Sequence, residues 1–371
     1  SGAEINFYNG YTFNDGTSAP NGGDINLNSG TFTLNDSVSL GQHAGAFGGT
    51  LAGTHTISGR LEVDGAVFDS SGTTTIASDG AVEFGNIEDN PLDRSFVNNG
   101  KILWSDGDMT GSGENSLTNN GEFAVSVDGT FGSAADDFSI QNDGKFIKTG
   151  GTGTTTIDVP FTNNGTIAAE TGQFHFTDNL TFGANATLGG GVQFDAPVSL
   201  SSSSTLAGNG TIMGSITTGG TVSPGNSIGS LSITGDLTLL SSSNSFFEVS
   251  GSTDPASSDT VSVSGTLTLA GTLSWNLLAS LDPVQTDVFT LYSASSLTGT
   301  FENVANGGRL FNSDKNRSFV VNYGPSSAFD VNSVVFSNFT FTPIPEPSTW
   351  ALMALGLGLV GMRITRRPRR S

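Results

Sequence analysis

Between residues 95 and 170 the chain repeats one pattern of apolar and polar positions. In each of four segments an apolar residue stands three positions before an Asn-Gly or Asp-Gly pair, and a second apolar residue stands two positions after the glycine. The segments are SFVNNGKILWS (95–105), SLTNNGEFAVS (116–126), SIQNDGKFIKT (139–149) and PFTNNGTIAAE (160–170). Their glycines are 21, 23 and 21 residues apart. A near-constant period of this length is typical of a solenoid, in which each unit buries its apolar face against the next unit.

The pattern within one unit predicts two short strands that flank a tight turn. Because Asn and Gly adopt positive φ at little cost, we expect positive φ at this turn. Stacking in register would create two internal columns of apolar side chains and one column of asparagines, whose amides can form a hydrogen-bonded ladder. The three columns are Phe96, Leu117, Ile140 and Phe161; Ile102, Phe123, Phe146 and Ile167; and Asn98, Asn119, Asn142 and Asn163.

Asn-Gly pairs also form β-hairpins, so an antiparallel sheet or sandwich is the alternative fold. A hairpin array would repeat about every 8 to 12 residues, whereas the observed period suits one coil of three strands. Gly and Thr interrupt nearly every helical window before residue 349. We therefore predict an all-β chain, a right-handed parallel β-helix (β-solenoid) with a β cap. The expected divisions are an N-terminal cap (1–20), the β-helix (21–280), a C-terminal β cap (281–342) and a tail (343–371).

Residues 206–239, LAGNGTIMGSITTGGTVSPGNSIGSLSITGDLTL, resemble the passenger-associated β-strand repeat of bacterial autotransporters. The shared features are a glycine-rich coil, the SPGNSIG corner and the strand pattern L-x-[IV]-x-G-[DN]-L-x-L. The resemblance implies further coils of the same β-helix. It ends differently from an autotransporter, because about 30 residues follow Phe341 and none of them suits a translocating β-barrel. We therefore expect no self-transport.

The charge of the chain is distributed unevenly. The formal net charge is −21, yet five of the 13 Lys and Arg residues lie in the last nine positions, so residues 1–342 carry about −25. Such a body repels nucleic acid and anionic lipid, whereas divalent cations, exopolysaccharide or cationic partners remain possible ligands. The chain has no Cys, which excludes disulfides and thiolate metal sites. Its 35% hydrophobic content argues against disorder.

Two signals for catalysis need to be weighed. Gly225-Asn226-Ser227-Ile228-Gly229 matches the G-x-S-x-G pattern of a hydrolase nucleophile elbow, which needs a following helix and a later acid and His. The three histidines all precede Ser227, so we interpret this segment as a corner set by Pro224. The histidines are His43, His55 and His175.

Neighbouring carboxylates could bind Ca²⁺ or act as the acid/base pair of a polysaccharide-cleaving β-helix. These pairs are Asp106 with Asp108, Asp136 with Asp137, and Glu88 with Asp89. A lyase also needs cations that stabilise the enolate, but between Lys101 and Arg309 only Lys145 and Lys148 are basic. We therefore expect solvated loop charges, with no catalytic residue, metal site or cofactor.

The tail contains a 13-residue uncharged run, WALMALGLGLVGM (350–362), followed by an arginine cluster. With its flanks it approaches the minimum of about 17 residues for a transmembrane helix. By the positive-inside rule the arginines stay cytoplasmic and the body lies outside. The anchor residues are Trp350, Leu352, Leu355, Leu357, Leu359 and Val360, and the cytoplasmic stop is formed by Arg363, Arg366, Arg367, Arg369 and Arg370.

Pro345, Glu346 and Pro347, followed by the apolar run and the arginines, resemble the PEP-CTERM sorting domain of Gram-negative bacteria. The resemblance implies that an exosortase, a membrane-embedded Cys transpeptidase, cleaves near the Pro-Glu-Pro after transient inner-membrane anchoring. The first residues have no basic or apolar signal region, so we expect Ser1 to follow a removed signal peptide.

These features together predict an exported, non-enzymatic protein of the cell surface, extracellular matrix or biofilm, with adhesion as one role it could serve. The expected partners are the exosortase and, before processing, the membrane; exopolysaccharide and divalent cations stay open, and nucleic acid is not expected. One alternative is a carbohydrate-active β-helix enzyme, a polysaccharide lyase or hydrolase that uses acidic loop residues. Another is a passive structural spacer or filament subunit.

Overall fold

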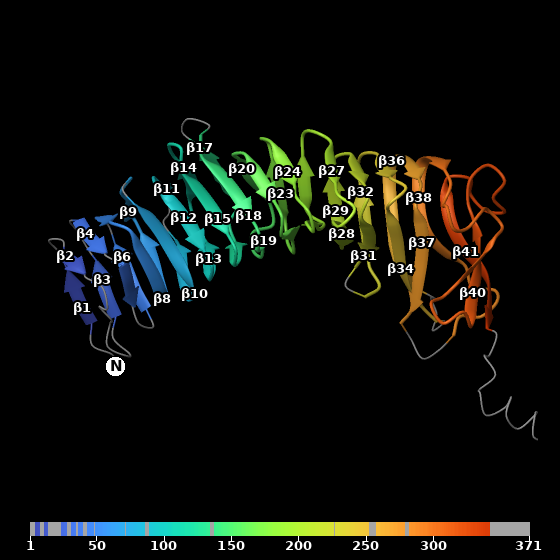
Figure 1. Cartoon of the computed structure of the whole chain (residues 1–371), viewed down its shortest axis with the longest axis horizontal. Coiled ribbons are helices and arrows are strands. Elements are labelled where there is room, and N and C mark those ends of the chain that lie inside the picture. Colours follow the sequence, from blue (N-terminus) through green and yellow to red (C-terminus); the bar gives the residue numbers. More distant parts are fainter. Residues whose placement is uncertain are drawn as a thin grey trace, which may run out of the picture.

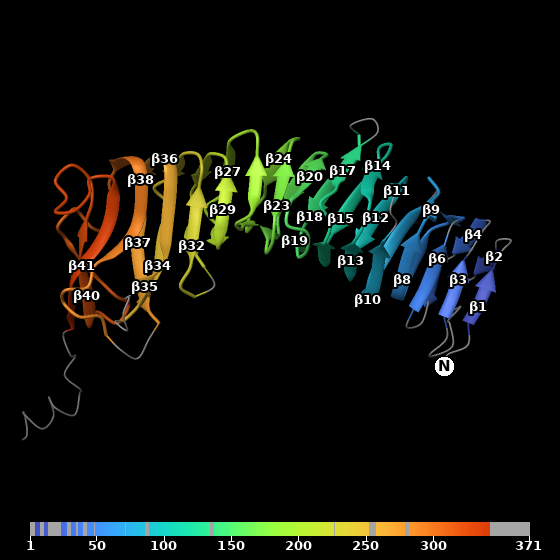
Figure 2. The same ribbon diagram turned by 180° about the vertical axis from the view of Figure 1, so that it is seen from behind.

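The computed structural model shows a bent rod of short parallel strands that run across its long axis, from β1 and β2 at one end to β40 and β41 at the other (Figures 1 and 2). In the N-terminal part it describes the strands at residues 4–7, 11–13, 24–27, 31–34, 36–39 and 43–47. From there it describes residues 49–341 except 71, 86–88, 134–136, 226, 252–256 and 279–281. Each turn of the rod contributes a strand to each of three ladders, here called ladders 1, 2 and 3 in the order in which the chain visits them. Neighbouring strands in a ladder pair in parallel wherever a register is defined.

Ladder 1 consists of β5 (Asp36–Ser39), the first halves of β8 (His55–Asp64) and β10 (Thr73–Phe84), β12 (Ser95–Asn98), β15 (Ser116–Asn119), β18 (Ser139–Asn142), β21 (Phe161–Asn163), β24 (Leu180–Phe182), β27 (Val198–Leu200), β30 (Ile216–Thr218), β33 (Leu237–Leu239), and the second halves of β36 (Thr260–Leu269) and β38 (Phe289–Gly299).

Ladder 2 consists of β1 (Glu4–Phe7), β3 (Asp24–Leu27), β6 (His43–Phe47), the second halves of β8 and β10, β13 (Lys101–Trp104), β16 (Glu122–Val125), β19 (Lys145–Lys148), β22 (Thr166–Ala169), β25 (Thr187–Leu188), β28 (Thr205–Gly208), β31 (Thr221–Pro224), β34 (Asn244–Ser250) and β37 (Thr272–Leu277).

Ladder 3 consists of β2 (Tyr11–Phe13), β4 (Thr31–Leu34), β7 (Thr50–Ala52), β9 (Val67–Phe68), β11 (Asp89–Leu92), β14 (Asp108–Gly111), β17 (Thr130–Ser133), β20 (Thr154–Asp158), β23 (Gln173–Phe176), β26 (Val192–Phe194), β29 (Gly210–Met213), β32 (Ser230–Ile233) and the first halves of β36 and β38.

The apolar columns expected from the repeat are confirmed. Phe96 pairs with Leu117, and the same register continues to Ile140 and Phe161 in ladder 1. The second column, Ile102, Phe123, Phe146 and Ile167, lies in ladder 2. All eight side chains are buried, and the rings of Phe123 and Phe146 stack with centroids 4.8 Å apart. Burial of this continuous apolar column is the main favourable contribution to folding.

The asparagine column is also confirmed, at the corner between ladders 1 and 2. The Nδ2 of Asn98 donates to Asn119 Oδ1, Asn119 donates to Asn142, and Asn142 donates to Asn163, each at 2.7 Å. Each of the first three Nδ2 groups also donates to a backbone carbonyl of the next turn, such as Glu122 O at 3.0 Å. The amides are fully buried, and these bonds offset the cost of removing them from water.

The expectation that the repeat glycines need positive φ is wrong. Gly100, Gly121, Gly144 and Gly165 do not have positive φ, although other glycines in the chain do. They are required for a different reason, which is the closeness of successive turns. A Cβ on Gly144 would lie 2.1 Å from the carbonyl oxygen of Gly121, and a Cβ on Gly165 would lie 2.0 Å from that of Gly144. Only glycine fits such an approach between backbones.

An antiparallel sheet follows the last parallel strands. β38 pairs in parallel with β36 and antiparallel with β41 (Ser333–Phe341), and β40 (Arg317–Asn322) lies antiparallel between β41 and β39 (Arg309–Phe311). The remaining short strand, β35 (Ser257–Ser258), is antiparallel to β34. We call β39, β40 and β41 with their loops the cap sheet. Its core contains the stacked rings of Phe319 and Phe336, 4.9 Å apart.

The all-β parallel solenoid is therefore confirmed, and the described residues contain no helix. The transmembrane helix expected at the C-terminus lies outside the described residues. The right-handed winding and the domain boundaries at residues 20, 280 and 342 stay predictions.

The close approach of successive backbones at the repeat glycines leads to a testable prediction. Gly144→Ala should lower the free energy of unfolding by about 1–3 kcal/mol, because the new methyl group must push two turns apart. Gly132→Ala is the matched control, since a Cβ there would meet nothing nearer than 3.9 Å and its φ is not positive. Thermal and urea unfolding measure both; equal melting temperatures for the two variants would contradict the steric explanation.

Candidate functional site

The Gly225–Gly229 corner does not have the geometry of a nucleophile elbow. It joins β31 to β32, so a strand follows Ser227. Gly225 and Ser227 have φ of 78° and 126°, which is a sharp turn that favours glycine. The buried carboxylate of Asp259 secures this corner by accepting hydrogen bonds from the backbone N–H of Gly229 (2.8 Å) and of Glu248 (2.7 Å). Its role in the fold is thus that of a corner brace, and burial raises the pKa of Asp259 to about 6.

The described histidines form hydrogen bonds with residues other than Ser227. The Nε2 of His175 on β23 lies 2.9 Å from Asp195 Oδ1 and 3.2 Å from Gln193 Nε2. In ladder 3 the strands β26 and β29 separate β23 from β32, the strand that follows Ser227. His55 belongs to a buried cluster near the N-terminal end, and the side chain of His43 is outside the described set. These positions bring no imidazole to Ser227.

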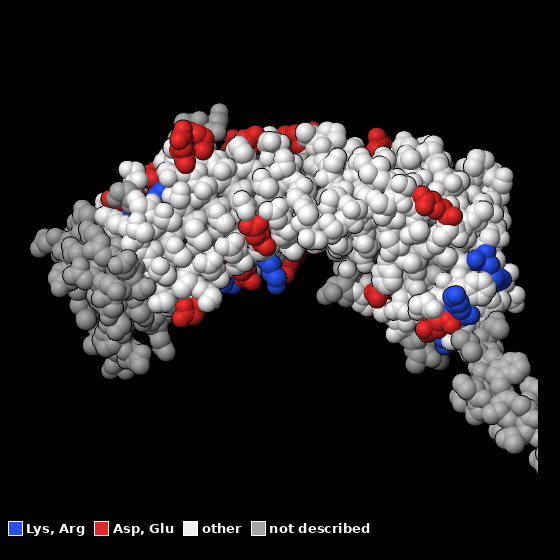
Figure 3. Space-filling view, viewed as in Figure 1, with Lys and Arg blue, Asp and Glu red and all other residues white. Residues whose placement is uncertain are grey.

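Where the structure describes the paired carboxylates, they accept hydrogen bonds from backbone N–H groups. Asp106 Oδ1 accepts from the backbone N–H of Gly107 at 2.9 Å, and Asp108 Oδ1 accepts from that of Thr130 at 2.7 Å. Glu88 and Asp136 lie outside the described residues. Within the described part of the chain no three His, Asp or Glu side chains are grouped to hold a metal ion. Acidic side chains lie along the convex edge of the rod and also on its front and concave edge, whereas basic ones lie near the end that carries the cap sheet and at the middle of the concave edge (Figure 3).

Two fully buried cations were not anticipated from the sequence. The Nζ of Lys148 donates to Val127 O (2.8 Å), Asp128 Oδ1 (2.7 Å) and Thr155 Oγ1 (2.8 Å). This pairing is the leading reason that the pKa of Asp128 is lowered. Lys148 thus ties consecutive turns together, and no donor of its ammonium is left for a substrate. No feature of the sequence distinguishes it from Lys145 in the same segment, which is exposed.

Arg94 plays the same part nearer the N-terminal end. Its guanidinium donates to the backbone carbonyls of Asp69 (2.7 Å), Gly53 (2.6 Å) and Leu51 (3.1 Å), and it pairs with the Asp69 carboxylate. The guanidinium lies 5.9 Å from the ring centre of Phe68. Arg94 therefore joins two earlier turns to its own.

His55 packs into the same buried cluster. Its Nδ1 lies 3.1 Å from Gly53 O and donates to it, so Nε2 accepts the hydroxyl of Thr74 at 3.1 Å. Burial, reinforced by the positive charge of Arg94, lowers the pKa of His55 to about 4. The imidazole is thus neutral in the folded protein at neutral pH and acts as a structural group.

A depression lies on the outer side of ladder 2, over β19, β22, β25 and β28. Its volume is about 780 Å³, and small residues line most of it, with Lys145 and Glu170 as its charged side chains. A neighbouring depression of about 440 Å³ shares Glu170 and Asn209 with it. Glu170 is the single carboxylate among the lining residues, so the pair of carboxylates that glycoside hydrolysis needs is not assembled there.

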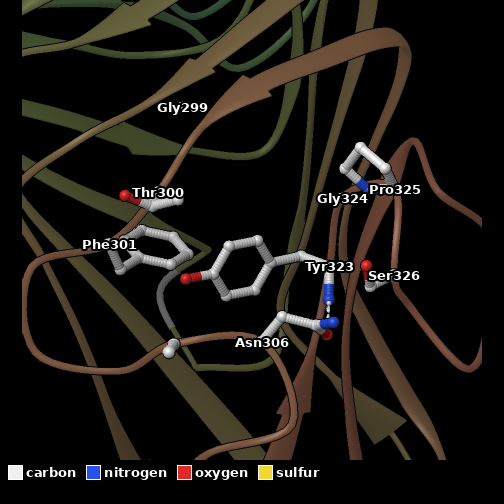
Figure 4. Close-up of a pocket in the computed structure, with 9 residues that line it drawn as sticks. Gly299, Thr300, Phe301, Asn306, Tyr323, Gly324, Pro325 and Ser326 are labelled. Atoms are coloured by element: carbon white, nitrogen blue, oxygen red, sulfur yellow. Dashed lines mark hydrogen bonds between the residues drawn. The ribbon is translucent and has the colours of Figure 1, made fainter.

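A smaller cavity of about 250 Å³ lies in the region of the cap sheet (Figure 4). The rings of Phe301 and Tyr323 meet edge to face with centroids 5.7 Å apart, and the Tyr323 hydroxyl donates to Val304 O at 2.6 Å. Asn306 Oδ1 accepts from the backbone N–H of Tyr323 at 2.9 Å. Burial raises the pKa of Tyr323. None of the lining residues is an acid, a His or a cation, so the cavity offers room without acid/base groups.

The residues expected to be processed and anchored, Pro345, Glu346, Pro347, the apolar run and the five arginines, lie outside the described residues. In the part that is described, no helix has the length and apolar character needed to span a bilayer.

Comparison with known proteins identifies the tail. The family model described as the PEP-CTERM protein-sorting motif matches residues 343–370. No curated protein matches the chain. The motif implies an exported protein with a transient membrane anchor that an exosortase processes, and the resemblance noted for the tail is thus confirmed.

The buried His55 makes stability dependent on pH. Its folded pKa of about 4 is below the usual 6.5. Between these values the unfolded chain binds a proton that the folded chain does not, so stability falls as pH falls from 6.5 towards 4. We expect His55 to account for a loss of about 2 kcal/mol between pH 7 and pH 5.

Urea unfolding at both pH values measures this loss in the parent and in His55→Gln, which does not titrate. The variant should be less stable at pH 7 but should lose about 2 kcal/mol less than the parent on acidification. Parallel pH profiles for the two proteins would show that His55 is not responsible.

Proposed function

We propose that the protein is a non-enzymatic component of the cell surface or extracellular matrix of a Gram-negative bacterium, delivered there through its Pro-Glu-Pro tail. The observation that carries this proposal is the match of residues 343–370 to the PEP-CTERM protein-sorting motif. Exosortase performs the chemistry, and this chain is its substrate. Adhesion within a biofilm, through exopolysaccharide or divalent cations on the acidic edge, is the role that we assign to the solenoid.

The form of the solenoid supports a structural rather than a catalytic role. Four of its five described cations serve as ties or ion pairs: Lys148 and Arg94 are buried, Lys101 pairs with Glu122 at 2.8 Å, and Arg60 pairs with Glu83. The fifth, Lys145, lines the large depression. A lyase needs a free cation beside its base to stabilise an enolate. The uniform turns also leave little loop from which walls of a substrate cleft could be built. We take the similarity of residues 206–239 to autotransporter passenger repeats as further support for a surface location.

Two alternatives remain as proposals of lower rank. A carbohydrate-active enzyme would be favoured by the depression that contains Lys145 and Glu170, if a second carboxylate came with the substrate or a partner. A passive spacer or filament subunit would use the same rod without a ligand. Binding of purified exopolysaccharide, with or without release of reducing ends, separates the three roles.

The sequence of the tail explains how it could be recognised. Pro345 and Pro347 restrict their own φ and disfavour helix in the residues before them, so we expect the segment to be extended. Extended backbone is the form that peptidases bind, and Glu346 is the single charge between Pro345 and Arg363. The apolar run would fix the height of this segment above the bilayer, and the arginines would prevent its passage across.

Glu346→Ala should therefore leave export and folding unchanged but cause a full-length, membrane-bound form to accumulate. Membrane fractionation and mass spectrometry of the C-terminus, in a host that has an exosortase, measure this. Ser348→Ala is the matched control, because it changes a neighbouring polar residue outside the Pro-Glu-Pro and should be processed normally. If Glu346→Ala were released like the parent, the tail would be an anchor without the proposed recognition.

A further inference from the structure

Exposed apolar side chains are concentrated at the C-terminal end of the described chain. Outside residues 278–341 the large hydrophobic residues exposed to solvent are Val67 and Leu240, among those the structure describes. Within that range seven are exposed: Leu278, Val284, Val288, Phe311, Phe329, Val331 and Phe341. Since soluble surfaces rarely group large apolar side chains, such a concentration points to a contact with something else.

Two of these side chains, Phe311 and Phe341, lie at the end of the cap sheet where β41 ends. β39 ends at Phe311, β40 begins at Arg317 and β41 ends at Phe341, so antiparallel pairing brings all three to one end of the cap sheet. Phe311 and Phe341 are 50% and 48% exposed. The guanidinium of Arg317 lies 5.0 Å from the ring centre of Phe341. The turn between β39 and β40 presents the exposed Lys315 at the same end.

Residues 282–288 run past this end of the sheet. Arg317 Nε donates to Asp282 Oδ1 at 2.5 Å, and Gln285 Nε2 donates to Asn338 Oδ1 at 3.0 Å. Val284, 51% exposed, belongs to this segment. We call Val284, Phe311, Lys315, Arg317 and Phe341 the exit surface.

The charge of the exit surface differs from that of the rest of the rod. Of the eight basic residues before the tail, three, Arg309, Lys315 and Arg317, lie at this end of the chain. Figure 3 shows basic side chains grouped there, beside acidic ones. Asp314, exposed beside Lys315, and Asp282, paired with Arg317, balance these charges, so the exit surface is close to neutral and is repelled less by phospholipid headgroups than the acidic solenoid is. Exposed aromatic rings beside a flexible exposed lysine such as Lys315 are suited to the interface of a bilayer.

The length of the connecting chain provides the second argument. Eight residues, 342–349, separate Phe341 from Trp350, the first residue of the apolar run. Fully extended they span at most about 30 Å. A tether this short raises the effective concentration of the cap sheet at the bilayer to the millimolar range, so even weak contacts would be populated.

We infer that the exit surface rests on the phospholipid bilayer while the tail is anchored, with Phe311 and Phe341 in the headgroup layer. This inference rests on the proposed function, because the tether exists only if the tail enters the membrane. The contact would hold the Pro345–Pro347 segment close to the bilayer surface, within reach of a membrane-embedded peptidase.

The absence of Cys from the chain allows a direct test. Single-Cys variants of the full chain, Phe311→Cys and Phe329→Cys, are labelled with a polarity-sensitive fluorophore and reconstituted in phosphatidylcholine vesicles that carry a headgroup-linked quencher. Phe329 is the matched control, since it is 39% exposed but follows β40 at the opposite end of the cap sheet. The two ends are about 27 Å apart along β41.

We expect a blue shift and loss of fluorescence at position 311 and neither change at position 329. Adding phosphatidylglycerol to the vesicles should strengthen the quenching at position 311. The increase should be smaller when Lys315→Ala is added to the labelled variant. It should be unchanged when Lys101→Ala, on the solenoid, is added instead. A blue shift at position 311 without quenching would mean that protein, such as a second copy, covers the surface, and would overturn the inference.

Flotation of the vesicles separates the two levels of the argument. Protein that floats but is not quenched at position 311 would overturn the bilayer contact and leave the anchor intact. Protein that does not float would remove the membrane anchor of the proposed function, and the contact inferred from it would fall as well.

Discussion

The close approach of successive backbones at the corner between ladders 1 and 2 is the constraint on which the solenoid depends. At Gly121, Gly144 and Gly165 the carbonyl oxygen of the preceding turn occupies the space where a Cβ would be, at 2.0–2.1 Å. Asn119 and Asn142, two positions before Gly121 and Gly144, each donate both to the amide of the next asparagine and to a backbone carbonyl of the next turn. Together they fix the register on both sides of the corner, so that the apolar columns of the two ladders stay aligned.

The period of the repeat allowed much of this to be predicted. Once the units at residues 95–170 are taken as stacked turns, the partners of Phe123 and Asn119 follow without further information, and both are found in the structure. The reason for the glycines did not follow, because a preference for positive φ is local whereas the contact of Gly144 with Gly121 O spans a whole turn. Turn chemistry in a sequence shows that glycine is needed without showing which neighbour requires it.

Single residues that join turns outside the repeat were the hardest to anticipate. Arg94 and Lys148 have no counterparts one period away, so no pattern indicates their burial. Arg94 has three carbonyl oxygens and one carboxylate around it, and Lys148 has one carbonyl oxygen, one hydroxyl and one carboxylate, which makes each buried cation tolerable. Their burial removes two of the eight cations that precede the tail from the surface, which makes the surface of the rod more acidic. The sorting motif could be predicted from the sequence, because its residues are contiguous. How a membrane enzyme recognises it could not, because that depends on where the folded chain holds the motif relative to the bilayer.

The cap sheet covers the free edge of the last strand of ladder 3, the first half of β38, which would otherwise be open to strands from other chains. β38 pairs with the solenoid through β36 and with the antiparallel β41, so the parallel ladder changes to a sheet that ends in a different direction. Because β41 is the last strand of the described residues, the same pairing that covers this edge determines where the described part of the chain ends. The exposed Phe311 and Phe341 lie at that point rather than along the solenoid, where such rings would be buried in the core columns. Closing the fold and presenting the sorting tail are thus achieved by one element.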